Sequence, residues 1–434
     1  MSRLLDVSLL QGGLPVTIFV VAAGGALVLL AGRGRRWWLR AVPVALAVGA
    51  VAAAAVAVAV DRVWRPFPDP LPAQVVVSVG ALVAGAGLAV LGWRARGRWT
   101  RVLSLLAVPA VLLGGAQWTN LAFQAYPTPR TALGLPPADQ RPFADIPTQA
   151  PLVAAHPGRP LSQTWTPPPG MPAAGAVTQV DIPGTRSGFA ARQAWLYLPP
   201  AYLASPRAQL PVLMLMGGQP GGPDQWFDGG RLAARMDAYA SEHDGLAPVV
   251  VVADDLGSAT ANPLCVDSRL SRVATYLSVD VPAWVRSHLQ VDPDPSRWAV
   301  GGFSGGATCA LQLAVNAPRV YPTFVFISGE DGPTLGDHAR TVQAAFGGNE
   351  AAFAAVNPLD VLAHTRFPGS AGFLVGGAQD SRYLPQAKRV HQAAKAAGMD
   401  VRLVVIPGGH SFDVWGPGLS DALPWLGTRL RLTP

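Results

Sequence analysis

The stretch Val300-Gly301-Gly302-Phe303-Ser304-Gly305-Gly306 decides the fold of the C-terminal part of this chain. An apolar run leads into a serine that has glycines two residues before it and two residues after it. Such glycines permit a sharp turn between a strand and a helix, where Cβ atoms would otherwise collide. We therefore predict that Ser304 stands on this turn as a nucleophile. A tight turn without chemistry is the alternative.

Two residues far downstream complete the arrangement that a nucleophilic serine needs. Asp380 lies just past an apolar run, and His410 lies in a Pro-Gly-Gly loop. The order serine, aspartate, histidine is the order in which α/β-hydrolases supply their catalytic triad. We predict that His410 takes the Ser304 proton and returns it to the leaving group, while Asp380 orients the imidazole. Glu330, Asp331 and Asp413 are the rival acids, although Asp413 is too near His410 along the chain. A loop histidine bonded to the backbone is the alternative for His410.

An oxyanion hole requires two preorganised backbone N–H groups. One is expected from Gly305, directly after the nucleophile. The second is expected from the segment Leu213–Pro220, which follows an early apolar run. Pro220 has no N–H and cannot donate. We predict that Gln219 is the donor, with Gly218 as the alternative.

Short apolar runs alternate with helical patterns from Gly175 onward, which is typical of a mostly parallel sheet covered on both faces. The expected fold class is α/β, an α/β-hydrolase domain with eight strands in which the nucleophile follows the fifth. The predicted strands are Ala176–Ile182, Ala191–Leu198, Pro211–Met216, Pro248–Ala253, Trp298–Phe303, Thr323–Ser328, Gly372–Gly376 and Val401–Ile406. The predicted helices are Gly230–Ser241, Ser278–His288, Gly305–Asn316, Thr341–Phe346, Pro385–Ala397 and Leu419–Leu430. The connection Gly329–Ser370 is either a lid or a set of ordinary helices.

Four apolar segments near the N-terminus are each long enough to cross a bilayer, which takes about 20 residues. They are Leu14–Ala31, Ala41–Val60, Gln74–Leu91 and Val102–Leu121. The loops after the first and third segments are rich in arginine, with Arg33, Arg35, Arg36 and Arg40 in one and Arg94, Arg96, Arg98 and Arg101 in the other. The positive-inside rule predicts that both loops are cytoplasmic. The N-terminus and everything after the fourth segment would then lie outside. A cleaved signal peptide is the alternative for the first segment.

The chain is expected to have three parts. Residues 1–125 form a four-span transmembrane region, which serves as an anchor because its spans carry no internal charge. Residues 126–174 are proline-rich and predict an extended extracytoplasmic linker. Residues 175–434 form the catalytic domain. The localisation that follows is a multi-pass protein of the cell membrane with the catalytic domain outside.

The two cysteines of the chain, Cys265 and Cys309, both fall in the outer domain. An even pair in an oxidising compartment favours a disulfide, with two buried thiols as the alternative. This disulfide would pin an active-site loop to the helix that follows Ser304. The sequence shows no metal-ligand spacing and no phosphate-binding loop, so we expect no metal and no cofactor. The net charge of +7 comes largely from loop arginines and lacks interleaved aromatics, which argues against nucleic acid as a partner.

From about Gly175 to the C-terminus the chain resembles the esterase family of the α/β-hydrolases, which includes esterase D-type enzymes and the antigen 85 mycolyltransferases. Leu215-Met216-Gly217-Gly218-Gln219 is similar to the oxyanion turn of that family, and Trp226-Phe227-Asp228 is similar to a Gly-Trp-Asp stretch. Phe303-Ser304-Gly305-Gly306 fits the nucleophile turn, and His410-Ser411-Phe412-Asp413-Val414-Trp415 resembles a histidine signature. The resemblance implies a triad of Ser304, Asp380 and His410 that works without a cofactor. Pro220 stands where the mycolyltransferases carry an arginine, and Asp380 stands where they carry a glutamate, which speaks against trehalose mycolyl transfer.

These features predict a membrane-anchored extracytoplasmic serine esterase that acts on carboxylic esters of small molecules or lipids through an acyl-enzyme. One alternative is an acyltransferase that moves the acyl group to a sugar or lipid alcohol of the cell envelope. A non-catalytic scaffold with the same fold is the other. The sequence leaves the acyl chain, the acceptor and the oligomeric state open.

Overall fold

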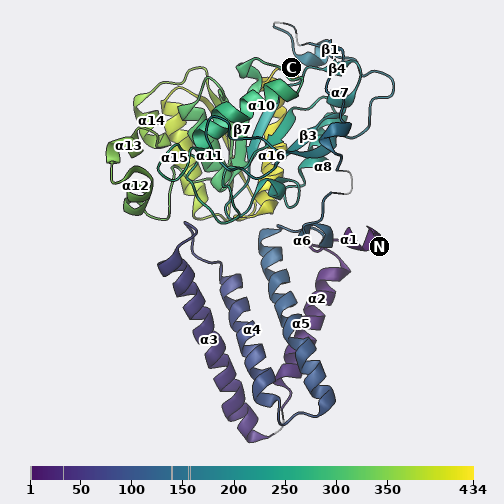
Figure 1. The fold of residues 1–434 in the computed structure, drawn as a ribbon, viewed down its shortest axis with the longest axis vertical. Helices are drawn as coiled ribbons and strands as arrows, with labels where there is room; N and C mark the ends of the chain where they lie inside the picture. The colour runs from purple at the N-terminus through teal and green to yellow at the C-terminus, as the bar shows by residue number, and fades with distance from the viewer. Residues whose placement is uncertain (1, 33, 138–139, 155, 157) are drawn as a thin grey trace. The chain divides into compact units, whose positions relative to one another are not determined.

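The computed structural model describes every residue of the chain except 1, 33, 138–139, 155 and 157. Arg33 of the first arginine-rich loop and four positions of the predicted linker therefore lie outside the described residues. The chain divides into two compact units, Met1–Leu135 and Pro136–Pro434 (Figure 1). Each unit is described here by itself.

Among the described residues of the first unit, four helices are long and apolar enough to cross a membrane. They are α2 (Gly13–Leu30), the continuous helix Trp37–Trp64 that contains α3 (Val42–Val58), α4 (Ala73–Gly92) and α5 (Arg98–Phe123). Each overlaps one of the four predicted segments. Their contacts use small residues, because a Cβ on Gly49 of α3 would overlap the backbone of α4 at Gly80. Such close backbone approach is the usual packing mode of helices in membranes.

Polar contacts tie together the ends of these helices. The Gln117 side chain of α5 donates to the Leu9 carbonyl at 2.6 Å, and Arg130 forms an ion pair with Asp6 at 2.7 Å. At the other end, Arg96 donates to the carbonyl of Leu29, the penultimate residue of α2, at 2.6 Å. The N-terminal segment therefore meets the segment after α5. At the opposite end the two arginine-rich loops meet, because the guanidinium of Arg96 lies 5.3 Å from the ring centre of Trp37.

The second unit contains an eight-stranded sheet, counted over the part of the chain that the structure describes. Its order is β10-β9-β8-β7-β5-β6-β3-β2, and the pairs β2–β3 and β3–β6 are antiparallel while the others are parallel. Its strands are β2 (Ala176–Val180), β3 (Ala194–Leu198), β5 (Val212–Met216), β6 (Val249–Val252), β7 (Trp298–Phe303), β8 (Thr323–Ile327), β9 (Ala371–Gly377) and β10 (Asp400–Ile406). Every residue of β5 to β9 is buried, as expected for strands covered on both faces. The predicted fold class is confirmed, and each predicted strand is present.

Helix α11 (Gly305–Asn316) packs on β7 and β8, and α16 (Phe412–Arg429) packs on β8 and β9. The helices α8 (Leu232–Ser241), α10 (Val281–His288) and α15 (Tyr383–Ala396) lie within or close to predicted ranges. Helix α16 begins at Phe412, seven residues before the predicted start at Leu419, and contains Pro417. Proline is unfavourable inside a helix, which is why the sequence predicts a later start. The connection 329–370 carries α12 (His338–Phe346), α13 (Glu350–Ala354) and α14 (Pro358–His364), and α14 packs on α11 and α15.

The proline-rich segment differs from the extended linker predicted over 126–174. The second unit begins at Pro136, well before Gly175. Within this stretch β1 (Leu152–Val153) pairs in parallel with β4 (Arg207–Ala208), side by side in Figure 1. Trp165 is buried and donates to the Asp244 carbonyl at 2.9 Å. Apolar side chains between the prolines therefore attach this segment to the domain of the eight-stranded sheet rather than leave it free.

Candidate functional site

Ser304 occupies the turn between β7 and α11, and its backbone is in the left-handed region at φ +52°. A residue with a Cβ rarely adopts this conformation, and such strain is concentrated at functional sites. Two glycines near Ser304 are required because a side chain would not fit at their positions. A Cβ on Gly302 would overlap the Gly306 carbonyl group, and a Cβ on Gly306 would overlap the carbonyl oxygen of Gly217. The turn therefore brings β7, α11 and the segment after β5 into direct contact.

The three residues predicted as a triad form one hydrogen-bonded chain. The Nε2 atom of His410 lies 2.9 Å from the Ser304 Oγ, and its Nδ1 atom lies 2.9 Å from Oδ2 of Asp380. Ser304 follows β7, Asp380 follows β9 and His410 follows β10. Because these strands are parallel, their carboxyl ends share one edge of the sheet, which is where ligands bind in such folds. The geometry permits His410 to accept the serine proton while Asp380 holds the ring.

The electrostatics of Asp380 suit this arrangement. Burial alone would raise the pKa of its carboxyl group, but hydrogen bonds from His410 and from the Tyr383 backbone N–H hold that pKa below its usual value. Asp380 is therefore a carboxylate at neutral pH. The carboxylate can accept a hydrogen bond from an N–H at Nδ1 of His410, which leaves Nε2 as the acceptor that faces Ser304.

Aromatic side chains that were not predicted as site residues fix the His410 ring. Tyr383 stacks on the imidazole with ring centres 4.0 Å apart, and Trp415 meets it edge-on at 5.0 Å. Trp415 in turn stacks on Phe303, the residue before the nucleophile, at 4.4 Å. Trp415 could have been identified from the sequence by its place in the histidine motif His410–Trp415. For Tyr383, the only indication in the sequence is its position three residues after Asp380.

The segment 217–222, here called the oxyanion turn, lies beside the turn of Ser304. A Cβ on Gly305 would stand 3.5 Å from the backbone nitrogen of Gln219, so the two predicted donors are neighbours. The alternative donor, Gly218, already gives its N–H to Oε1 of Gln225 at 2.9 Å. Gly305 is the first residue of α11, where backbone N–H groups lack partners in a preceding turn. Gln219 remains a predicted donor, with its backbone nitrogen beside Gly305.

An ion pair that the sequence analysis missed supports the oxyanion turn. Arg192 makes a salt bridge of 2.6 Å with Asp254, whose side chain is fully buried, and donates to the carbonyl of Gly221 at 2.9 Å. Next to it, burial and the negative charge of Asp254 raise the pKa of Asp255 to about 8. The pair Asp254-Asp255 follows the buried strand β6 at the same edge of the sheet. This position directly after an apolar run is the feature of the sequence that could have indicated the pair.

Of the candidate acids, Asp380 is the one whose carboxylate faces Nδ1 of His410. Asp331 forms an ion pair with Arg389 at 2.6 Å, and the backbone N–H of Glu330 donates to the Thr308 hydroxyl at 2.9 Å. In the described part of the chain, no group of three or more histidine, cysteine or acidic residues could hold a metal ion.

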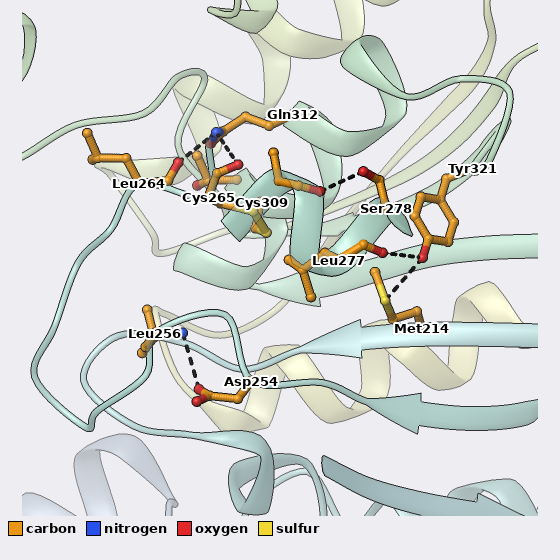
Figure 2. The surroundings of a disulfide bond; sticks show 12 residues. Met214, Asp254, Leu256, Leu264, Cys265, Leu277, Ser278, Cys309, Gln312 and Tyr321 are labelled. Carbon is orange, nitrogen blue, oxygen red and sulfur yellow. Dashed lines mark hydrogen bonds between the residues drawn. A yellow bond between two sulfur atoms is a disulfide. The ribbon is translucent and has the colours of Figure 1, made fainter. Parts of the chain in front are cut away.

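Cys265 and Cys309 are joined in a disulfide across 44 residues of sequence (Figure 2). Cys309 lies on α11, five residues after Ser304, and Cys265 lies in the loop after β6. On the same helix, the Gln312 side chain donates to the carbonyls of Leu264 and Cys265 at 2.7 and 3.3 Å. The loop after β6 is thus attached to the helix that begins directly after Ser304.

A serine on a tight turn after β7, in a mostly parallel eight-stranded sheet, defines an α/β-hydrolase fold. Residues 190–426 match the model of the Esterase family, described as "Putative esterase". The chain belongs to this family, as its motifs predict.

A relative from Corynebacterium glutamicum, an uncharacterized protein, is 36% identical over 425 residues, and the alignment covers 95% of each chain. This coverage extends over the N-terminal helices as well as the hydrolase domain. Two solved structures share the fold. A ferulic acid esterase has a TM-score of 0.51 and 15% identity over 59% of this chain and 99% of its own. An S-formylglutathione hydrolase from Agrobacterium tumefaciens has a TM-score of 0.50 and 18% identity over 60% and 97%.

Proposed function

We propose that this protein is a serine esterase that cleaves carboxylic esters through an acyl-enzyme on Ser304. The observation that carries the proposal is the hydrogen-bonded chain from Ser304 through His410 to Asp380, with both distances at 2.9 Å. A serine hydroxyl is a weak nucleophile alone and is activated by an adjacent base that a third group orients. Membership of the Esterase family supports the same chemistry.

The reaction would proceed in two halves. His410 takes the Ser304 proton as Oγ attacks the ester carbonyl, and the backbone N–H groups of Gly305 and Gln219 stabilise the oxyanion. The protonated His410 then gives its proton to the leaving alcohol, and the acyl group remains on Ser304. Water activated by His410 releases the acid. A sugar or lipid alcohol in place of water would make the same intermediate a transferase.

The proposed location is the cell membrane, with the hydrolase domain outside the cytoplasm. Support comes from the four apolar helices and from the two arginine-rich loops, which meet at one end of them. The segment that leads to the catalytic domain meets the N-terminal segment at the opposite end. This location would favour esters of small molecules or of lipids near the membrane surface as substrates.

The first test is intact-mass detection of a fluorophosphonate adduct on the detergent-purified full chain. We expect one adduct on the wild-type protein and none on Ser304→Ala. Ser241→Ala, which changes an exposed serine at the end of α8, should leave the adduct unchanged. No adduct on folded wild-type protein would reject the esterase and favour a scaffold.

The second test distinguishes hydrolysis from transfer. Release of acid from a short-chain ester is compared with the formation of acylated product in the presence of added trehalose, glucose or glycerol. Free acid at an unchanged rate, with no acylated sugar at any acceptor concentration, supports the esterase. Acylated acceptor as the main product would replace it with the acyltransferase.

A further inference from the structure

The residues 256–267, here called the brace loop, lie between β6 and α9 (Val273–Thr275) and form hydrogen bonds with the oxyanion turn. The Nε2 atom of Gln219 donates to the Ala261 carbonyl at 2.8 Å, and the backbone N–H of Gly221 donates to the Ala259 carbonyl at 2.9 Å. Gln219 also carries one of the proposed oxyanion donors. The position of that donor therefore depends on where the brace loop stands.

The brace loop has an exposed tip and a buried base. Residues 258–260 are exposed, whereas residues 263–266 are buried. At the base, the Cys265–Cys309 disulfide and the hydrogen bonds from Gln312 attach the loop to α11 (Figure 2). Long irregular loops in a compact domain are commonly functional, and their ordering needs such attachments. Only two residues separate Ala261 from the buried Leu264, so a shift of the base reaches the tip.

The base adopts a backbone conformation that its surroundings must maintain. Leu264 and Cys265 both have left-handed φ angles, +69° and +55°. Two successive residues with side chains rarely take this conformation, and it persists only where neighbouring structure enforces it. In this conformation both carbonyls accept hydrogen bonds from one side chain, that of Gln312. Removing the disulfide or Gln312 would therefore release the base.

We propose that the Cys265–Cys309 disulfide and Gln312 act as positioning residues, which hold the Gln219 N–H of the oxyanion turn through the brace loop. Helix α11 begins directly after Ser304 and carries both Cys309 and Gln312. One helix therefore determines the position of the oxyanion donor relative to Ser304. This inference rests on the proposed esterase function. Both cysteines are buried, at 6% and 0% exposure, which suits a permanent brace better than a thiol switch.

The test compares three changes in the detergent-purified full chain: the double variant Cys265→Ala/Cys309→Ala, Gln312→Met and Gln219→Met. The last of these removes the side-chain contact of the tip and keeps the backbone N–H. Gln209→Met is the matched control, because Gln209 also donates to a backbone carbonyl, that of Val291, but precedes β5 at its opposite end. The readouts are kcat and KM for p-nitrophenyl acetate, the rate of fluorophosphonate labelling, near-UV circular dichroism and the melting temperature.

We expect each of the three changes to lower kcat and the labelling rate roughly tenfold at temperatures well below melting. Complete loss of an oxyanion donor typically costs 10²–10³-fold, and displacement costs less. KM should stay within about twofold, because the ester is bound equally before the charge develops. Combining Gln312→Met with Gln219→Met should cost clearly less than the product of the single effects, since both act on one path. A role in stability alone would lower the melting temperature without this pattern.

Folded variants with wild-type kcat would overturn the inference, as would single effects that multiply or an equal loss in Gln209→Met. If the disulfide variant does not fold, the two glutamine variants decide the matter alone. A wild-type protein that fails to react with the fluorophosphonate would overturn the proposed function itself. Wild-type reactivity with undiminished turnover in the variants would overturn only the positioning role.

Discussion

Replacing Asp380 with asparagine tests the proposed triad, because the structure dictates how the new amide must lie. The Oδ1 atom of Asp380 accepts a hydrogen bond of 3.0 Å from the Tyr383 backbone N–H, and Oδ2 faces Nδ1 of His410. An asparagine keeps the bond from Tyr383 only if its oxygen takes the Oδ1 position. Its NH₂ group then faces His410 and must donate to Nδ1.

This reversal puts the imidazole in the wrong tautomer. With Nδ1 as acceptor, the ring proton moves to Nε2, which then cannot take the proton of Ser304. The side chain at position 380 is only 4% exposed, so water does not readily replace the lost interaction. In a serine protease triad the same change costs about 10⁴ in kcat, which is about 5 kcal/mol of transition-state stabilisation. We expect Asp380→Asn to lose on the order of 10³–10⁴ in kcat with little change in KM.

The assay is ester turnover by the purified full chain, together with the rate of fluorophosphonate labelling and the melting temperature. Asp331→Asn is the matched control, because it changes a rival acid that is paired with Arg389. It should keep kcat within about twofold. An Asp380→Asn protein that retains more than a tenth of the wild-type kcat would refute the reasoning. So would a loss in Asp331→Asn as large as that in Asp380→Asn.

Three further predictions address the turn, a buried acid and the topology. Gly306→Ala should destabilise the fold by about 1–3 kcal/mol and reduce labelling, because its Cβ overlaps the backbone, whereas Gly369→Ala, which meets nothing within 4 Å, should melt like wild type. The pKa of Asp255 is about 8 in the folded protein and about 3.9 when unfolded, so its contribution to the unfolding free energy is complete below about pH 4 and declines towards pH 8. Asp255→Asn should therefore make the melting temperature less dependent on pH between 5 and 7, and an unchanged slope would contradict this. On intact cells, an impermeant maleimide should label Gly134→Cys, and Arg36→Cys only after permeabilisation; the opposite pattern would reverse the proposed orientation.

Much of the fold could be predicted because its signals are local. A buried parallel strand such as Val249–Val252 shows as a continuous apolar run, and a span such as Gly13–Leu30 shows by length and composition. The turn at Ser304 could be predicted because Gly302 has no room for a Cβ beside the backbone of Gly306, only four residues away. These features depend on residues that are close together in the chain, and they can therefore be predicted from the local sequence pattern.

The remaining features depend on which distant segments meet. The acid that bonds to His410 is decided by the adjacency of β9 and β10, which selects Asp380 over Asp331. The salt bridge between Arg192 and Asp254 joins loops at the ends of β3 and β6, and no local pattern marks it. The proline-rich segment looks extended because prolines suppress periodicity, yet Trp165 and Leu161 are buried in the folded structure. The hydrophobic periodicity of a sequence depends on the local backbone conformation and on which side of a helix or strand is buried. The contacts between segments that are distant in sequence depend on tertiary packing, which exists only once the chain has folded.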